Sequence, residues 1–129
     1  MSDSASPECP FCHLDPARVL EENELASAFA DAFPVSPGHT LVVPRRHASD
    51  FFELSQAELG AVFRVLLRMR CRLADEHHPS GFNVGVNIGE AGGQTVPHVH
   101  VHLIPRFPGD VLDPRGGVRN VIPGKGPYP

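Results

Sequence analysis

Hydrophobic and polar residues recur at two different periods along the 129-residue chain. Short apolar or alternating runs, bounded by turn-forming residues, predict strands over residues 18–22, 25–30, 40–43, 82–88 and 96–104. Between them, Ser55 and Glu58 have the spacing of a capping box, so a helix is expected to begin there. The apolar stripe of that helix is expected to comprise Leu59, Val62, Phe63, Leu66, Met69 and Leu73. It should end at the His77–Gly81 segment, HHPSG.

The order of these elements is strands, one long helix, then strands. This order predicts an α+β domain in which an antiparallel sheet carries the helix on one face. All of the predicted elements fall within residues 9–106, which are expected to form a single domain. Residues 1–8 are small and polar and are expected to be disordered. Residues 107–129 are rich in proline and glycine and are expected to lack regular structure.

Composition narrows the class of protein. A net charge of −4 argues against a nucleic-acid-binding surface, and 41% hydrophobic residues suffice for one core. We find no run long enough for a membrane span and no signal-peptide pattern, so the protein is expected to be cytoplasmic. Three cysteines do not make a disulfide framework.

Three of the eight histidines stand at every second position of the last predicted strand: His98, His100 and His102. Alternate side chains of a strand share a face, so the imidazoles are expected on one face, with Val99 and Val101 on the other. Adjacent members would be about 7 Å apart at Cα and could share one substrate or one metal ion. Neutral imidazole is a nucleophile, and its neighbour can donate a proton. The row therefore suits phosphoryl or nucleotidyl transfer through a phosphohistidine.

Other interpretations of the row remain open at this point. Three histidines at period two would fill a hydrophobic core poorly. Three strand-borne imidazoles could instead hold a catalytic zinc ion, or they could be surface residues without a common role.

The segment Gly92–Arg106, GGQTVPHVHVHLIPR, closely resembles the signature of the histidine-triad family of nucleotide hydrolases and transferases. The similarity extends to Pro37–Pro44, PGHTLVVP, and to the predicted strand at 82–88, so it covers roughly residues 9–106. It implies a half-barrel of sheet and helix, usually a homodimer, with a nucleoside monophosphate bound against the last strand.

The resemblance also implies roles for individual residues. His100 matches the nucleophile, and His98 and His102 match the neighbours that orient it and contact phosphate oxygens. The remaining matches are His39 for an additional histidine of the pocket, Asp31 for the ribose hydroxyls, and Asn87, Gln94 and Thr95 for the phosphate region. These side chains have the donors and acceptors that such contacts need. Asp31 and Asn87 could also be ordinary turn or strand-end residues.

Cys9 and Cys12 form a Cys-Pro-Phe-Cys motif. A redox pair of this kind normally follows a strand and precedes a helix, and that setting is absent from the sequence pattern here. The chain is similar to bacterial histidine-triad proteins in which such a pair joins two histidines, which by position are His47 and His98. Two thiolates and two imidazoles would form a closed, structural zinc site. A coordinated His98 would then be unavailable as an acid or base.

The leading functional hypothesis is hydrolysis of a diadenosine polyphosphate or a similar AMP conjugate through a nucleotidyl-His100 intermediate. Alternatives are a nucleoside phosphoramidase, a phosphorylase that uses inorganic phosphate, and a non-enzymatic nucleotide-binding module. In the tail, Arg115 and Arg119 could clamp the distal phosphates of a longer substrate.

Overall fold

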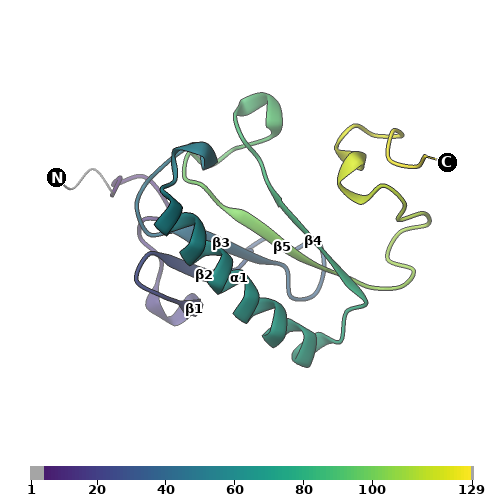
Figure 1. Ribbon diagram of the computed structural model, residues 1–129, viewed down its shortest axis with the longest axis horizontal. Coiled ribbons are helices and arrows are strands. Elements are labelled where there is room, and N and C mark those ends of the chain that lie inside the picture. Colours follow the sequence, from purple (N-terminus) through teal and green to yellow (C-terminus); the bar gives the residue numbers. More distant parts are fainter. Residues whose placement is uncertain (1–4, 129) are drawn as a thin grey trace.

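The computed structural model describes residues 5–128 as an open antiparallel sheet with one long helix packed on it (Figure 1). The strands and the helix are β1 (Val19–Glu22), β2 (Ala26–Ala30), β3 (Thr40–Pro44), α1 (Gln56–His77), β4 (Gly81–Val86) and β5 (Val101–Arg106). In the sheet the strands follow the order β1-β2-β3-β5-β4, and every pairing is antiparallel. This arrangement confirms the predicted α+β class.

Helix α1 begins and ends at residues whose local chemistry fixes its boundaries. The Ser55 hydroxyl accepts a hydrogen bond from the Glu58 amide, and the Glu58 carboxylate accepts one from the Ser55 amide. This is the predicted capping box. At the other end His78 adopts a left-handed conformation, and its amide donates to Ala74 O.

The two faces of the sheet differ: one packs against α1, and the other carries the histidine row beside a smaller apolar cluster. The core lies between the sheet and α1, where Val42, Val101 and Leu103 pack with Val65 and Met69 of the helix. On β5, His102 faces away from this core and lies opposite Leu41 of β3 and Gly85 of β4. The histidine face is therefore free of the helix.

Two predictions differ from the structure: the residue at which the last strand begins, and the set of helix residues that are buried. Strand β5 begins at Val101 rather than residue 96, because Val99 N–H donates to Ala48 O instead of joining the ladder. In α1, Phe63 is 59% exposed and Leu59 is 37% exposed, although both were expected in the buried stripe. Ala61 and Val65 lie against the sheet in their place.

Residues 5–8 and 107–128 make more regular contacts than their composition indicates. The predicted disorder of residues 1–4 lies outside the described residues, whereas the Ser6 carbonyl already accepts from the Cys9 amide. In the tail, Gly117–Val121 forms a short 3-10 helix, η4, so the expectation of no regular structure was wrong there. No helix among residues 5–128 has the length and apolar character needed to cross a membrane.

Candidate active site and metal centre

The histidine row keeps its alternation although its first two members precede strand β5. His98 and His100 are buried, and Val99 between them packs with Ala48 and Leu54 in a separate apolar cluster. The three imidazoles do not converge on one point, because each has a different partner. A single metal ion held by all three histidines is therefore excluded as an interpretation of the row.

His100 is oriented by the backbone of its neighbour. Its Nδ1 lies 2.8 Å from the carbonyl oxygen of His98, and because a carbonyl can only accept, Nδ1 carries the proton. Neutral His100 then has its lone pair on Nε2. The ring of Phe11 packs edge-on against His100, with 5.2 Å between the centroids, and fixes the plane of the imidazole.

His102 is oriented by a chain of contacts that begins at a backbone amide. Val35 N–H donates to Nδ1 of His39 over 3.1 Å, so the proton of neutral His39 is on Nε2. That Nε2 donates to Nδ1 of His102 over 2.9 Å, and Asp31 Oδ2 lies 3.4 Å from it. His102 must therefore carry its own proton on Nε2.

Burial supports this assignment of protons. Desolvation lowers the pKa of His39. Desolvation, together with the neighbouring His100 and His39, also lowers the pKa of His102. Both rings are therefore neutral at pH 7, as the donor and acceptor pattern requires. His102 presents an N–H beside His100, which presents a lone pair.

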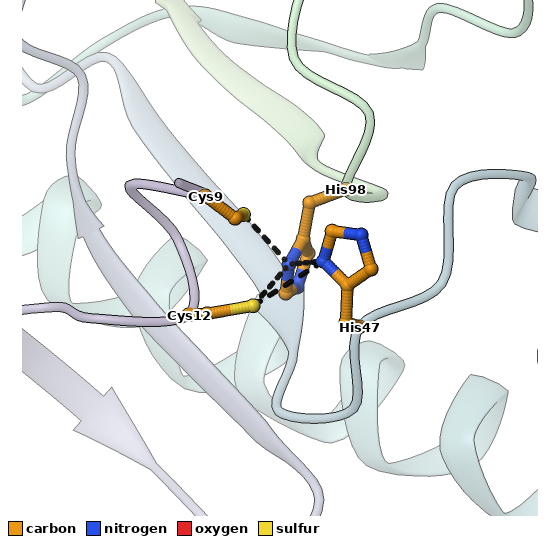
Figure 2. Close-up of side chains that lie close together, drawn as sticks. All are labelled: Cys9, Cys12, His47 and His98. Atoms are coloured by element: carbon orange, nitrogen blue, oxygen red, sulfur yellow. Dashed lines mark hydrogen bonds between the residues drawn. The ribbon is translucent and has the colours of Figure 1, made fainter. Parts of the chain in front are cut away.

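On the other side of the row, two cysteines and two histidines face one another (Figure 2). Nδ1 of His98 lies 3.3 Å from Cys9 Sγ and 3.5 Å from Cys12 Sγ, and Nδ1 of His47 lies 3.2 Å from Cys12 Sγ. A tetrahedral zinc ion with Zn–S of about 2.3 Å and Zn–N of about 2.0 Å would place sulfur and nitrogen ligands about 3.5 Å apart. The cluster has the dimensions of such a site.

The proton positions also fit a metal. Nε2 of His98 lies 2.8 Å from Pro44 O and must donate to it, which leaves the Nδ1 lone pair facing the sulfurs. Burial lowers the pKa of His98 and favours the neutral, ligating form. His98 is therefore placed for ligation and not for proton transfer.

A second cluster of possible ligands, Asp31, His39 and His102, has the wrong protonation for a metal. In neutral His39 the proton is on Nε2, the atom that faces the other two residues, because Val35 N–H occupies Nδ1. A protonated ring nitrogen cannot ligate. We therefore assign this cluster to proton chemistry.

The structure brings some of the predicted nucleotide contacts together and separates others. Asn87 lines one pocket with His39 and His102, and Asp31 contacts His39 directly. Gln94 and Thr95 line a different depression, which none of the histidines lines. The Gln94 amide is held by backbone groups, since it donates to Ser49 O and Val96 O and accepts from Gly89 N–H.

Two arginines of the tail bind groups of the tail itself. Arg115 pairs with Asp113, and Arg119 donates to Gly126 O and Lys125 O. The phosphate clamp predicted for these two arginines stays a prediction.

Sequence reasoning missed two contributors to the site. Phe11 was passed over although it stands between the two cysteines, a position that gave a usable signal. The Val35 amide carries no signal in the sequence, because any residue except proline supplies the same donor.

Comparison with known proteins gives a consistent result. The HIT domain model matches residues 14–109. An uncharacterized HIT-like protein of Mycoplasma genitalium is 40% identical over 83% of this chain and 79% of its own length. AP-4-A phosphorylase of Mycobacterium tuberculosis is 37% identical over 84% of this chain, which spans 59% of that protein.

Two further matches bear on the chemistry. The asymmetrical bis(5'-nucleosyl)-tetraphosphatase of Schizosaccharomyces pombe is 36% identical over 73% of this chain and 52% of its own length. A solved structure, the zinc-bound histidine triad family protein of Mycobacterium smegmatis, superposes with a TM-score of 0.72. It is 35% identical over 82% of this chain and 80% of that one.

Proposed function

Since the chain belongs to the histidine-triad (HIT) family of nucleotide hydrolases and transferases, we propose that it hydrolyses nucleotide phosphoanhydrides through a covalent nucleotidyl-His100 intermediate. The observation that carries this proposal is the pair of opposite tautomers in adjacent neutral rings. His100 has a lone pair on Nε2, and His102 has a proton on Nε2. One ring is suited to attack phosphorus and the other to donate a hydrogen bond to the group that leaves.

In the first step, Nε2 of His100 forms a bond to the α-phosphorus, and the bond from phosphorus to the leaving group breaks. The leaving oxygen keeps the electron pair of the broken bond, and the Nε2 N–H of neutral His102 donates a hydrogen bond to it. The His100 ring becomes positively charged, and the His98 carbonyl stabilises that charge through the hydrogen bond at Nδ1.

In the second step, water attacks the same phosphorus and the phosphorus–nitrogen bond breaks. The electron pair of that bond returns to Nε2 of His100, and one proton of the water is released to solvent. The sum is substrate plus water giving a nucleoside monophosphate, the leaving group and a proton. In both steps His39 holds His102 in the required tautomer.

For the substrate we propose a diadenosine polyphosphate or a related AMP conjugate. The names of two relatives, a phosphorylase and a tetraphosphatase acting on such compounds, support this class. A phosphoramidate is the second candidate, because it offers the same phosphorus to Nε2 of His100 with a leaving nitrogen in place of a leaving oxygen. The products identify the acceptor of the second step. Transfer of the adenylyl group to water gives AMP, and transfer to inorganic phosphate gives ADP.

The proposal is tested by intact mass after brief incubation with adenosine 5'-phosphoroimidazolide and an organic quench. We expect an added adenylyl group on the wild type and none on His100→Ala. His78→Asn, at the exposed end of the helix, serves as the control and should be labelled like the wild type. Binding without any adduct would favour the non-enzymatic alternative.

We propose zinc as the occupant of the Cys9, Cys12, His47 and His98 cluster, with a structural role. When bound, zinc would cross-link the N-terminal segment to the residue that begins the histidine row. The zinc-bound relative supports the choice of metal. Free thiolate ligands persist in a reducing compartment, so we also propose a cytoplasmic location.

We propose that the protein is a homodimer. Strand β4 is an edge strand of the sheet, and Val84 on it is 50% exposed. The exposed apolar residues of α1, Leu59, Phe63 and Leu67, lie on the side of the helix that carries Arg70, whose guanidinium lies 5.6 Å from the Phe82 ring centroid. The edge strand β4 and these exposed apolar residues of α1 therefore form one apolar surface that is suited to contact a second copy of the chain.

Sedimentation equilibrium tests this association. The wild type should sediment with twice the chain mass, and Phe63→Glu should shift it to the mass of a single chain. Phe52→Glu is the control, at a phenylalanine that is even more exposed and lies outside α1, and it should leave the mass unchanged.

A further inference from the structure

The segment between β2 and β3, residues 31–39, carries the group that sets the tautomer of His39. Val35 N–H donates to Nδ1 of His39 over 3.1 Å, and the proton on Nε2 then faces His102. The amide can direct that ring only where the amide is itself held in place. The Val35 side chain is 73% exposed, so its packing does little to hold the amide, and the support must come from a neighbouring residue.

Ser36, the next residue along the chain, is tied to the last strand of the sheet. Its hydroxyl donates to the carbonyl oxygen of Pro105 over 2.9 Å. Pairing between β3 and β5 stops at Thr40 and Leu103, so the last three residues of β5 extend past the start of β3. This extension lacks ladder hydrogen bonds from β3, and Ser36 supplies one donor in their place.

Ser36 is the half-buried residue of an exposed stretch. Residues 32–35 and 37 are all exposed. The far end of the segment is fixed separately, because a Cβ on Gly38 would lie 3.0 Å from side chains of α1. A backbone bond from His39 N–H to Ser36 O closes the turn but moves with it. The Ser36 hydroxyl therefore ties the middle of the segment to the sheet.

Two prolines make the stretch around Ser36 stiff. Pro34 has a fixed φ, and Pro37 restricts the backbone of Ser36 to extended conformations. Few backbone torsions remain in which a displacement of Ser36 could be absorbed. Such a displacement is therefore passed on to the adjacent Val35 amide.

We propose that Ser36 is a positioning residue of the active site. Its bond to Pro105 O holds the Val35 amide against Nδ1 of His39. The His39 proton is thereby kept on the nitrogen that faces His102. This inference rests on the proposed function, in which His102 presents an N–H to the leaving oxygen. Without the amide, His39 could carry its proton on Nδ1, and His102 would then turn a lone pair toward the leaving group.

The first test is NMR of 15N-labelled protein without substrate. Ser36→Ala removes the hydroxyl, and Ser36→Thr keeps it. In Ser36→Ala the Val35 amide should exchange its hydrogen faster. The ring 15N shifts of His39 should move away from those of a ring protonated on Nε2 alone. Both signals should return to wild-type values in Ser36→Thr, whereas a purely structural role would lower the melting temperature and move neither signal.

The second test is steady-state kinetics with diadenosine triphosphate. Ser36→Ala should lower kcat about fivefold, the factor that corresponds to one intramolecular hydrogen bond, and should change KM less than about twofold. Ser36→Thr should restore kcat. Ser27→Ala is the matched control, because it removes the hydroxyl of a buried serine on β2 that lies outside the segment. It should change neither kcat nor the His39 shifts.

Unchanged Val35 exchange and His39 shifts in Ser36→Ala would overturn the assignment, and so would equal effects of Ser36→Ala and Ser27→Ala. Failure of the proposed function gives a different result. In that case no adduct forms on His100 in the mass measurement, while the NMR signals of Ser36→Ala still respond, because they need no substrate.

Discussion

Replacing Glu58 by glutamine should destabilise the protein by about 2 to 3 kcal/mol at neutral pH. Glu58 is 6% exposed and lies in the first turn of α1. Its carboxylate accepts two hydrogen bonds of 2.9 Å from Arg46 and one from the Ser55 amide. The contacts with Arg46 are the largest cause of a pKa lowered from 4.5 to about 2.

The magnitude follows from this shift. Each pKa unit corresponds to about 1.4 kcal/mol, so the shift is worth about 3 kcal/mol. Because the pKa is lower in the folded state, this stability is fully present above pH 4.5 and is lost as the pH falls toward 2. Glutamine has a similar shape without the charge, so it removes most of that contribution at pH 7.

Urea denaturation followed by circular dichroism at 222 nm measures the effect as a function of pH. The free energy of unfolding of the wild type should exceed that of Glu58→Gln by about 2 to 3 kcal/mol at pH 7. The difference should shrink between pH 4.5 and pH 2. Other titratable groups contribute equally to the free energy of unfolding of both proteins, so their contributions cancel in the difference between wild type and variant.

Glu76→Gln is the control. Glu76 pairs with Arg72 at 3.1 Å, but its side chain is 49% exposed, so its loss should cost less than about 0.5 kcal/mol. The reasoning is refuted if the two variants lose the same stability, or if the Glu58→Gln difference does not change with pH. Arg46 precedes the proposed ligand His47, so Glu58→Gln should also weaken zinc binding.

Three further outcomes are expected. Cys12→Ser should lower the zinc content, measured by mass spectrometry of metals, from about one ion per chain to none, and it should lower the melting temperature. Cys71→Ser, at an exposed helix position, should change neither quantity. His39→Ala should lower kcat about 10- to 100-fold with a smaller change in KM, because His102 loses the partner that fixes its tautomer, and the exposed His13→Ala should not. In wild type the acid limb of the kcat profile should lie below pH 6.5, because burial lowers the pKa values of His39 and His102, and activity is lost as falling pH protonates these rings.

Features that depend on local chemistry could be predicted from the sequence. The capping box at Ser55 and Glu58 placed the start of α1 because both hydrogen bonds join residues three apart. The alternation around His100 also survived, although no ladder is formed there, because Val99 and Val101 each have an apolar cluster to enter. Hydrophobic pattern alone therefore set which way these side chains face.

Features that depend on distant partners could not be predicted in this way. The first residue of β5 is set by the Val99 amide, which donates to Ala48 far away in sequence. Phe63 was expected in the core because a helix pattern shows apolarity but not which apolar side faces the sheet. Gln94 was expected to contact a phosphate, but its side-chain amide is hydrogen-bonded to three backbone groups. One of these groups, Ser49 O, is distant in sequence, so the sequence pattern could not predict the contact.

Backbone groups set the tautomers of His98, the first histidine of the row, and of His39, the partner of the last one, His102. At His98 a carbonyl, Pro44 O, takes the Nε2 proton and directs a lone pair to the thiols. At His39 an amide, Val35 N–H, does the reverse and leaves a proton facing His102. The same side chain is thus suited to ligate a metal where the backbone accepts its proton, and to present an N–H where the backbone donates to it. His100 stands between these two settings with its lone pair unclaimed by any described residue, and the nucleophile is therefore expected at that position.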